Sequence, residues 1–158
     1  MRLSASAMEH PMSRVTLEIE SSCSNISLMA VAINAIGAYA GLDRDKSNSV
    51  ELALVEAVTN SIVHGYHGEP NHRVTVTIEC DQRHIRFNLM DTGDPMQSDQ
   101  VERLIRGRGI NDAEYPDLST IKEGGRGLEI IHRTMDQISY KREGRQNHLT
   151  LTSNLATD

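Results

Sequence analysis

Residues 54–66 read LVEAVTNSIVHGY, and this stretch decides how the rest of the chain is interpreted. Leu54, Val58 and Ile62 recur every four residues, which is the spacing of one apolar face of an α-helix. The pattern predicts a helix from about Asp45 to Tyr66 with this stripe turned toward a core. The opposite side of that helix is polar and carries no lysine or arginine, which is unusual for a face open to water.

The polar stripe contains Glu56 and Asn60, one helical turn apart, so their side chains are neighbours. A carboxylate can accept a proton or orient a hydroxyl, and an amide oxygen can ligate Mg²⁺. An isolated pair of this kind is more often an ordinary surface feature. Asparagine is a poor helix former, however, and its place in mid-helix points to a use other than helix formation.

Two further motifs follow along the chain. Asp91-Thr92-Gly93 closes an alternating apolar run, where the carboxylate could stabilise a turn or accept a hydrogen bond from an exocyclic amine such as that of adenine. Residues 124–127 read GGRG before an apolar-periodic segment, which is typical of a phosphate cradle or of a flexible connector. Neither a Walker A loop nor a dinucleotide-binding fingerprint is present.

The flanking sequence predicts the remaining elements. Apolar residues that alternate with polar ones predict strands at 15–19, 74–78, 85–89, 138–142 and 148–152, of which 74–78 and 85–89 form a hairpin. Apolar residues at three- and four-residue spacing predict a helix at 26–40 capped by Gly41, a short helix at 99–105 and a helix through 128–135. Because the strands come in hairpins, we expect an α+β fold with a mostly antiparallel sheet, covered on one face by three helices.

Composition sets further bounds. A chain of 158 residues is one domain, and with 3% aromatic residues and no tryptophan its core must be aliphatic. A net charge of -6 without a basic block argues against nucleic-acid binding. Cys23 and Cys80 lack metal-ligand spacing and are interpreted as reduced thiols, with a single disulfide as the alternative. We expect no apolar run near the roughly 20 residues of a membrane span, and no signal peptide.

The order of these motifs resembles the anti-sigma-factor serine kinases, a branch of the ATPase superfamily that includes histidine kinases, DNA gyrase, Hsp90 and MutL. Residues 56–66 resemble the first signature of the branch, residues 91–93 its adenine-binding motif and residues 124–128 its glycine motif. The resemblance extends from about residue 15 to residue 151. The Glu four residues before the Asn favours this branch over the histidine kinases.

The resemblance implies the Bergerat fold, a two-layer sandwich whose mixed, mostly antiparallel sheet carries helices on one face and holds ATP beneath a lid. We expect one such domain over residues 13–155, with the lid at about 94–124, after a disordered leader at 1–12. Many relatives have a further glycine soon after the adenine-binding motif. This chain has Asp94-Pro95 there, which stiffens the entrance to the lid.

The resemblance also implies roles for individual residues. Glu56 is the expected base that orients the attacking serine hydroxyl, Asn60 the Mg²⁺ ligand, and Asp91 the partner of the adenine amine. His64 lies where the family often has histidine near the phosphates, although a packing role is equally compatible with its position. The remaining nucleotide-binding candidates are the glycines and their neighbours: Gly93, Gly124, Gly125, Arg126, Gly127 and Leu128.

The implied function is an ATP- and Mg²⁺-dependent protein-serine/threonine kinase that acts as a cytoplasmic, homodimeric anti-sigma factor in a partner-switching system of transcription regulation. It would bind a sigma factor and phosphorylate a STAS-domain antagonist. Two alternatives stay open. One is a regulatory module that binds ATP and sequesters a partner without phosphoryl transfer. The other is an ATPase subunit that acts on a different target.

Overall fold

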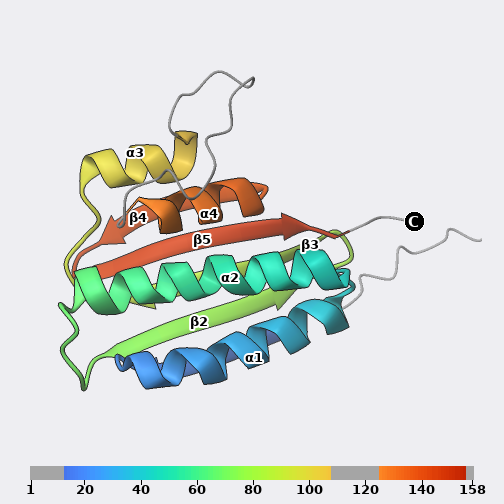
Figure 1. Cartoon of the computed structure of the whole chain (residues 1–158), viewed down its shortest axis with the longest axis horizontal. Helices are drawn as coiled ribbons and strands as arrows, with labels where there is room; N and C mark the ends of the chain where they lie inside the picture. Colours follow the sequence, from blue (N-terminus) through green and yellow to red (C-terminus); the bar gives the residue numbers. More distant parts are fainter. Residues whose placement is uncertain (1–12, 108–124, 156–158) are drawn as a thin grey trace, which may run out of the picture.

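The computed structural model describes residues 13–107 and 125–155, and Figure 1 shows them as one sheet with helices stacked against one face. The elements follow one another as β1 Ser13–Glu20, α1 Cys23–Ala40, α2 Arg44–Asn60, the π-helical turn η1 Ser61–Gly65, β2 Arg73–Cys80, β3 His84–Asp91, α3 Ser98–Arg106, α4 Arg126–Thr134, β4 Gln137–Glu143 and β5 Gln146–Asn154. Each helix and strand predicted from the periodicity is confirmed, within a few residues at the ends.

The sheet has the strand order β1-β2-β3-β5-β4. All four described pairings are antiparallel, so the sheet is not mixed in the part of the chain that the structure describes. The last strand of the chain, β5, lies between β3 and β4, and its register sets Asn147 directly opposite Asp91. This pairing across 56 residues of sequence joins the C-terminal hairpin to the end of the central strand.

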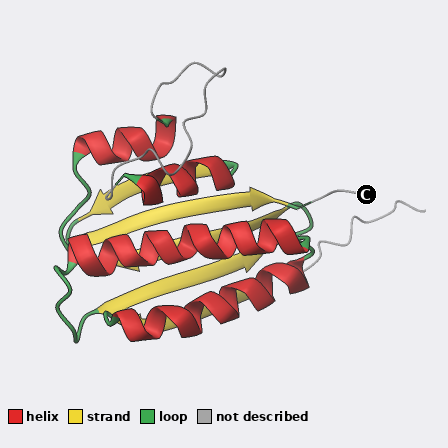
Figure 2. Ribbon diagram, in the orientation of Figure 1, coloured by secondary structure: helices red, strands yellow, loops and turns green. Residues whose placement is uncertain are grey.

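The helices form the second layer of the sandwich (Figure 2). α1 packs against α2, α2 against α4, and α3 against α4 and β4. The helical layer therefore contains four helices, because the short helix α3 joins the three that were expected to cover the sheet. Gly41 ends α1 in the left-handed region at φ 103°, as predicted from its position. The side chain of Asp43 then caps α2 by accepting a hydrogen bond from Lys46 N at 2.8 Å.

The core lies between the helices and the covered face of the sheet. The predicted stripe of Leu54, Val58 and Ile62 is at most 1% exposed, and it meets alternate residues of the central strands. The core is aliphatic, as the composition predicts, apart from two aromatic residues, Tyr66 and Phe87, the only phenylalanine of the chain. Apolar burial on this scale is the main term that stabilises the domain.

The end of the long helix differs from the prediction in detail. A regular helix was expected up to Tyr66, but α2 changes at Ser61 into the π-helical turn η1. The wider turn closes with Tyr66 N donating to Ser61 O at 2.9 Å. Single π turns of this kind occur frequently at functional sites, because they redirect the side chains that follow.

Two predictions lie partly or wholly outside the described residues: the disordered leader at 1–12, and residues 108–124 of the lid. The expectation that no segment is apolar enough to cross a membrane is wrong for α1, which is long and apolar enough by length and composition. That criterion alone is weak, because helices of soluble domains also meet it, and α1 packs on α2 and β1. Cys23 and Cys80 are both free thiols.

Candidate functional site

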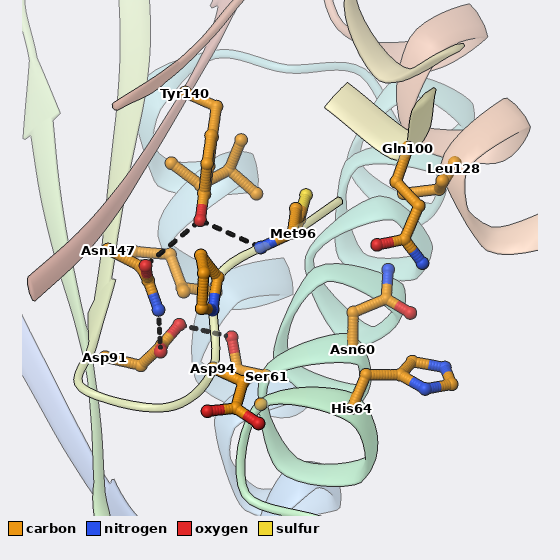
Figure 3. Close-up of a pocket in the computed structure, with 14 residues that line it drawn as sticks. Asn60, Ser61, His64, Asp91, Asp94, Met96, Gln100, Leu128, Tyr140 and Asn147 are labelled. Atoms are coloured by element: carbon orange, nitrogen blue, oxygen red, sulfur yellow. Dashed lines mark hydrogen bonds between the residues drawn. The ribbon is translucent and has the colours of Figure 1, made fainter. Parts of the chain in front are cut away.

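A cavity opens between the end of α2 with η1, the turn after β3, and the C-terminal hairpin (Figure 3). The apolar part of its wall is formed by Leu89, Pro95, Met96, Leu128 and Leu149. The polar lining comprises Asn60, Ser61, His64, Asp91, Asp94, Gln100, Tyr140 and Asn147. A cavity with apolar walls and a few convergent polar groups suits a flat heterocyclic ligand.

Asp91 lies at the bottom of this cavity and is 7% exposed. Its Oδ2 accepts a hydrogen bond from Ser61 Oγ at 2.8 Å, and its Oδ1 accepts from Gly93 N at 2.9 Å and from Asn147 Nδ2 at 2.8 Å. The three donors come from η1, from the turn after β3 and from β5. These three donors hold the carboxylate in one orientation, with no positively charged partner within residues 13–107 and 125–155, and leave acceptor capacity for a ligand.

Gly93 is required by packing. A Cβ atom placed there would lie 2.6 Å from Gly65 C and 2.7 Å from Gly65 O, closer than real Cβ contacts. The same contact is reinforced by Asp94 N, which donates to Gly65 O at 2.8 Å. Gly93 therefore packs on the backbone of η1, and this contact joins the first motif to the second.

Asn60 and His64 lie on the rim of the cavity, one turn apart on the same side of the helix end (Figure 3). Asn60 Nδ2 is buried and has no hydrogen-bond partner among the described residues. The two ends of an amide can exchange by a rotation of the side chain, so Asn60 can present its oxygen to the cavity instead. The unpartnered amide fits the predicted role of a ligand to Mg²⁺. His64 is exposed, at the outer edge.

Glu56 does not line the cavity but lies one turn before Asn60, where α2 packs against α4. A Cβ atom at Gly127 would collide with Glu56 Oε2 and would lie 3.3 Å from its Cδ. Glycine at this position therefore leaves room for the carboxylate between the helices. The contact brings the first motif and the glycine motif together, although about 70 residues separate them in sequence.

The other residues of the glycine motif lie at the start of α4. Gly125 is the residue before the first turn of the helix and is buried, Arg126 is exposed, and Leu128 lines the cavity. Gly124 lies outside the described residues. The positive end of α4 is thus directed toward the region where Glu56 packs on Gly127, which is an arrangement suited to an anion.

Sequence reasoning missed Ser61, Tyr140 and Asn147. Ser61 follows directly after Asn60, and its polar side chain on the otherwise apolar side of the helix was the available signal. Tyr140 and Asn147 gave no such signal, because each sits in an unremarkable alternating strand. Only the register of β5 against β3 and β4 places them beside Asp91.

Comparison with known families shows which family the chain belongs to. The model of the histidine kinase-like ATPase domain matches residues 19–153, nearly all of the described chain. The chain belongs to this family. The expected membership of the histidine kinase-like ATPases is thereby confirmed, and an ATPase domain implies that the protein binds ATP.

Individual relatives narrow the membership to the anti-sigma-factor serine kinases. The chain is 30% identical to the anti-sigma F factor of Oceanobacillus iheyensis over 132 residues, covering 78% of this chain and 80% of that protein. It is 24% identical to the serine-protein kinase RsbW of Listeria innocua over 132 residues, covering 83% and 82%. The serine-protein kinase RsbW of Staphylococcus aureus is 25% identical over 132 residues, covering 82% and 80%.

Proposed function

We propose that this protein is an ATP-dependent protein-serine/threonine kinase and anti-sigma factor of a partner-switching system, and that it phosphorylates a STAS-domain antagonist. The names of the relatives supply the two halves of this proposal, kinase and anti-sigma factor. The observation that carries the kinase half is the position of Glu56, a half-buried carboxylate packed on Gly127 and one turn from the cavity residue Asn60.

Adenine recognition is assigned to Asp91. Its carboxylate is the only buried acid on the cavity wall within the described residues, and three protein donors orient it. An all-acceptor group suits the exocyclic amine of adenine, which is a donor. The apolar side chains of Leu89, Leu128 and Leu149 then cover the faces of the ring.

Asn60 is the proposed protein ligand of Mg²⁺, and the triphosphate of the bound ATP is proposed to extend toward the start of α4. Among the described residues no group of three or more His, Cys, Asp or Glu could hold a metal ion. Mg²⁺ commonly binds through one or two protein ligands together with phosphates and water, so one amide oxygen suffices on the protein side. The ion would neutralise charge on the phosphates during transfer. His64 and Arg126 lie where they could contact the phosphates.

Glu56 is assigned to the serine hydroxyl of the antagonist. Within the described part of the chain its carboxylate accepts no hydrogen bond, so it is available to a substrate. A positioned general base contributes roughly 10²–10⁴-fold to a rate. A module that only binds ATP has no need of such a group, and this distinguishes the proposal from the alternative without phosphoryl transfer.

The test is transfer from γ-labelled ATP to a STAS-domain protein of the same genome. We expect Glu56→Ala to lower the rate at least ~100-fold while the dissociation constant for ATP changes less than about threefold. Glu51→Ala is the matched control, because Glu51 lies on the same helix but accepts a hydrogen bond from Asn34 of α1 at 2.6 Å. Full activity of Glu56→Ala would remove the assigned role. A stable complex with the wild type without any phosphoprotein would favour the regulatory module.

We further propose that the protein is a cytoplasmic homodimer and that it also binds a sigma factor. The support is the resemblance together with the names of the relatives. Light scattering coupled to gel filtration should give twice the chain mass of 17.5 kDa, and a monomer at micromolar concentration would contradict the dimer.

A further inference from the structure

Asn147 makes more hydrogen bonds than its place in an ordinary strand would suggest. It is 3% exposed and stands opposite Asp91 in the β3–β5 pairing. Its Nδ2 donates to Asp91 Oδ1 at 2.8 Å and to Gly93 O at 3.0 Å. Its Oδ1 accepts from Tyr140 Oη at 3.0 Å and from Arg142 Nη1 at 3.3 Å. The amide has two donor hydrogens and two acceptor positions, and all four are used.

These partners fix which way the amide points. The carboxylate of Asp91 and the carbonyl of Gly93 can only accept, and the guanidinium of Arg142 can only donate. Rotation of the amide by 180° would set two acceptors against Oδ1 and a donor against Nδ2. The orientation shown in Figure 3 is therefore the one the network permits. With its capacity filled, Asn147 has no hydrogen bond left for a bound base.

Tyr140 extends the network to the chain beyond β3. Its hydroxyl donates to Asn147 and accepts from Met96 N at 3.0 Å, so one oxygen connects β4, β5 and the segment before α3. Burial raises the pKa of Tyr140 above its usual value, and the charge of Asp91 raises it further. A tyrosine hydroxyl keeps its proton at neutral pH even at its usual pKa of about 10, so Tyr140 is a donor to Asn147.

We propose that Asn147, held by Tyr140, is a positioning residue that sets the selectivity of the site for bases carrying an exocyclic amine. A carboxylate has about four acceptor positions, and Ser61, Gly93 and Asn147 occupy three around Asp91. The remaining position faces the cavity, where it accepts from an amine and repels a carbonyl oxygen. This inference rests on the proposed role of Asp91 in adenine recognition.

The experiment compares ATP with ITP, whose base carries a carbonyl oxygen in place of the amine, by titration calorimetry. We expect the wild type to prefer ATP at least ~tenfold. In Asn147→Leu the preference should fall to about threefold or less, because Asp91 can then turn away from the amine. Asn88→Leu is the matched control: Asn88 lies on β3 but bonds Glu79 and Thr150 on the uncovered face of the sheet, and the preference should stay unchanged.

A merely structural role for Asn147 would weaken ATP and ITP equally, and an unchanged ratio would therefore overturn the inference while leaving the role of Asp91 intact. A wild type without any preference would overturn both. If Asn147→Leu fails to fold, the preference for ATP over ITP is measured in Tyr140→Phe instead. This substitution removes one of the two donors to Asn147 Oδ1 together with the acceptor of Met96 N, which loosens the amide without removing it, and the preference for ATP should fall about two- to fivefold. An unchanged ratio in Tyr140→Phe would refute the proposal.

Discussion

Strand β3 has an aspartate in the turn before it, Asp81, and another as its last residue, Asp91, and the two carboxylates are held in opposite ways. Before the strand, Asp81 Oδ1 accepts hydrogen bonds from Arg83 N at 2.7 Å and His84 N at 2.8 Å, both within three residues and open to water. At the other end, Asp91 is buried and takes two of its three donors from residues 30 and 56 positions away.

The difference separates a structural turn from a ligand site. Asp81 satisfies the backbone of its own turn, so the local sequence is sufficient to build it. Asp91 is oriented by distant elements and keeps acceptor capacity toward a cavity, at the cost of burying a charge that needs donors. A carboxylate that two distant elements orient is therefore the better candidate for binding a ligand.

The largest loss of stability around these two carboxylates is expected from a substitution at Gly93, which packs on Gly65 next to Asp91. Gly93→Ala would push a methyl group into the backbone of η1, so we expect a loss of about 1–3 kcal/mol in the free energy of unfolding, measured by urea denaturation. Gly65→Ala is the control from the opposite side of the same contact. Its Cβ would lie 3.7 Å from Asp94 O and Gly93 Cα, an ordinary distance. Equal losses in the two variants would refute the packing argument.

A smaller loss of stability is expected from a substitution at Asp81. The backbone amide of Arg83 holds the pKa of this carboxyl below its usual 3.8, against an opposing cost of burial, and His84 lowers the pKa further. A lowered pKa in the folded state stabilises the fold above the unfolded-state pKa, and the contribution disappears as the pH falls through the folded value.

The thermal midpoint of Asp81→Asn should therefore lie a few degrees (~1–4 °C) below that of the wild type at pH 7, and the gap should close as the pH falls below about 3.8. Calorimetry at several pH values measures both. A gap that widens in acid would contradict the assignment.

Much of the fold could be predicted because its determinants are local. Apolar residues at four-residue spacing in α2 and alternating runs in β2, β3 and β5 fix both the element and its buried face. Gly41 could be recognised as a cap for the same reason, since only glycine adopts its φ of 103° readily. The motif residues Asn60 and Asp91 could be identified from sequence, and the structure places both in one cavity.

What could not be predicted depends on register and packing between distant segments. The position of Asn147 follows from the pairing of β5 with β3, and no pattern inside β5 indicates it. The π turn η1, which directs Ser61 toward Asp91, arises where α2 meets the turn after β3. The space that Gly127 leaves for Glu56 depends likewise on how α4 docks on α2.

The most direct measurement of the central claim is the affinity for ATP of the wild type and of two matched variants, Asp91→Asn and Asp81→Asn. Each variant replaces one carboxylate oxygen with an amide nitrogen, in the turn before β3 for Asp81 and at the last residue of β3 for Asp91. We predict that Asp91→Asn weakens ATP binding ~100-fold or more, because a charged acceptor and its amine contact are lost, and that Asp81→Asn stays within about twofold. Equal affinities in the two variants would show that the cavity beside Asp91 is not the nucleotide site.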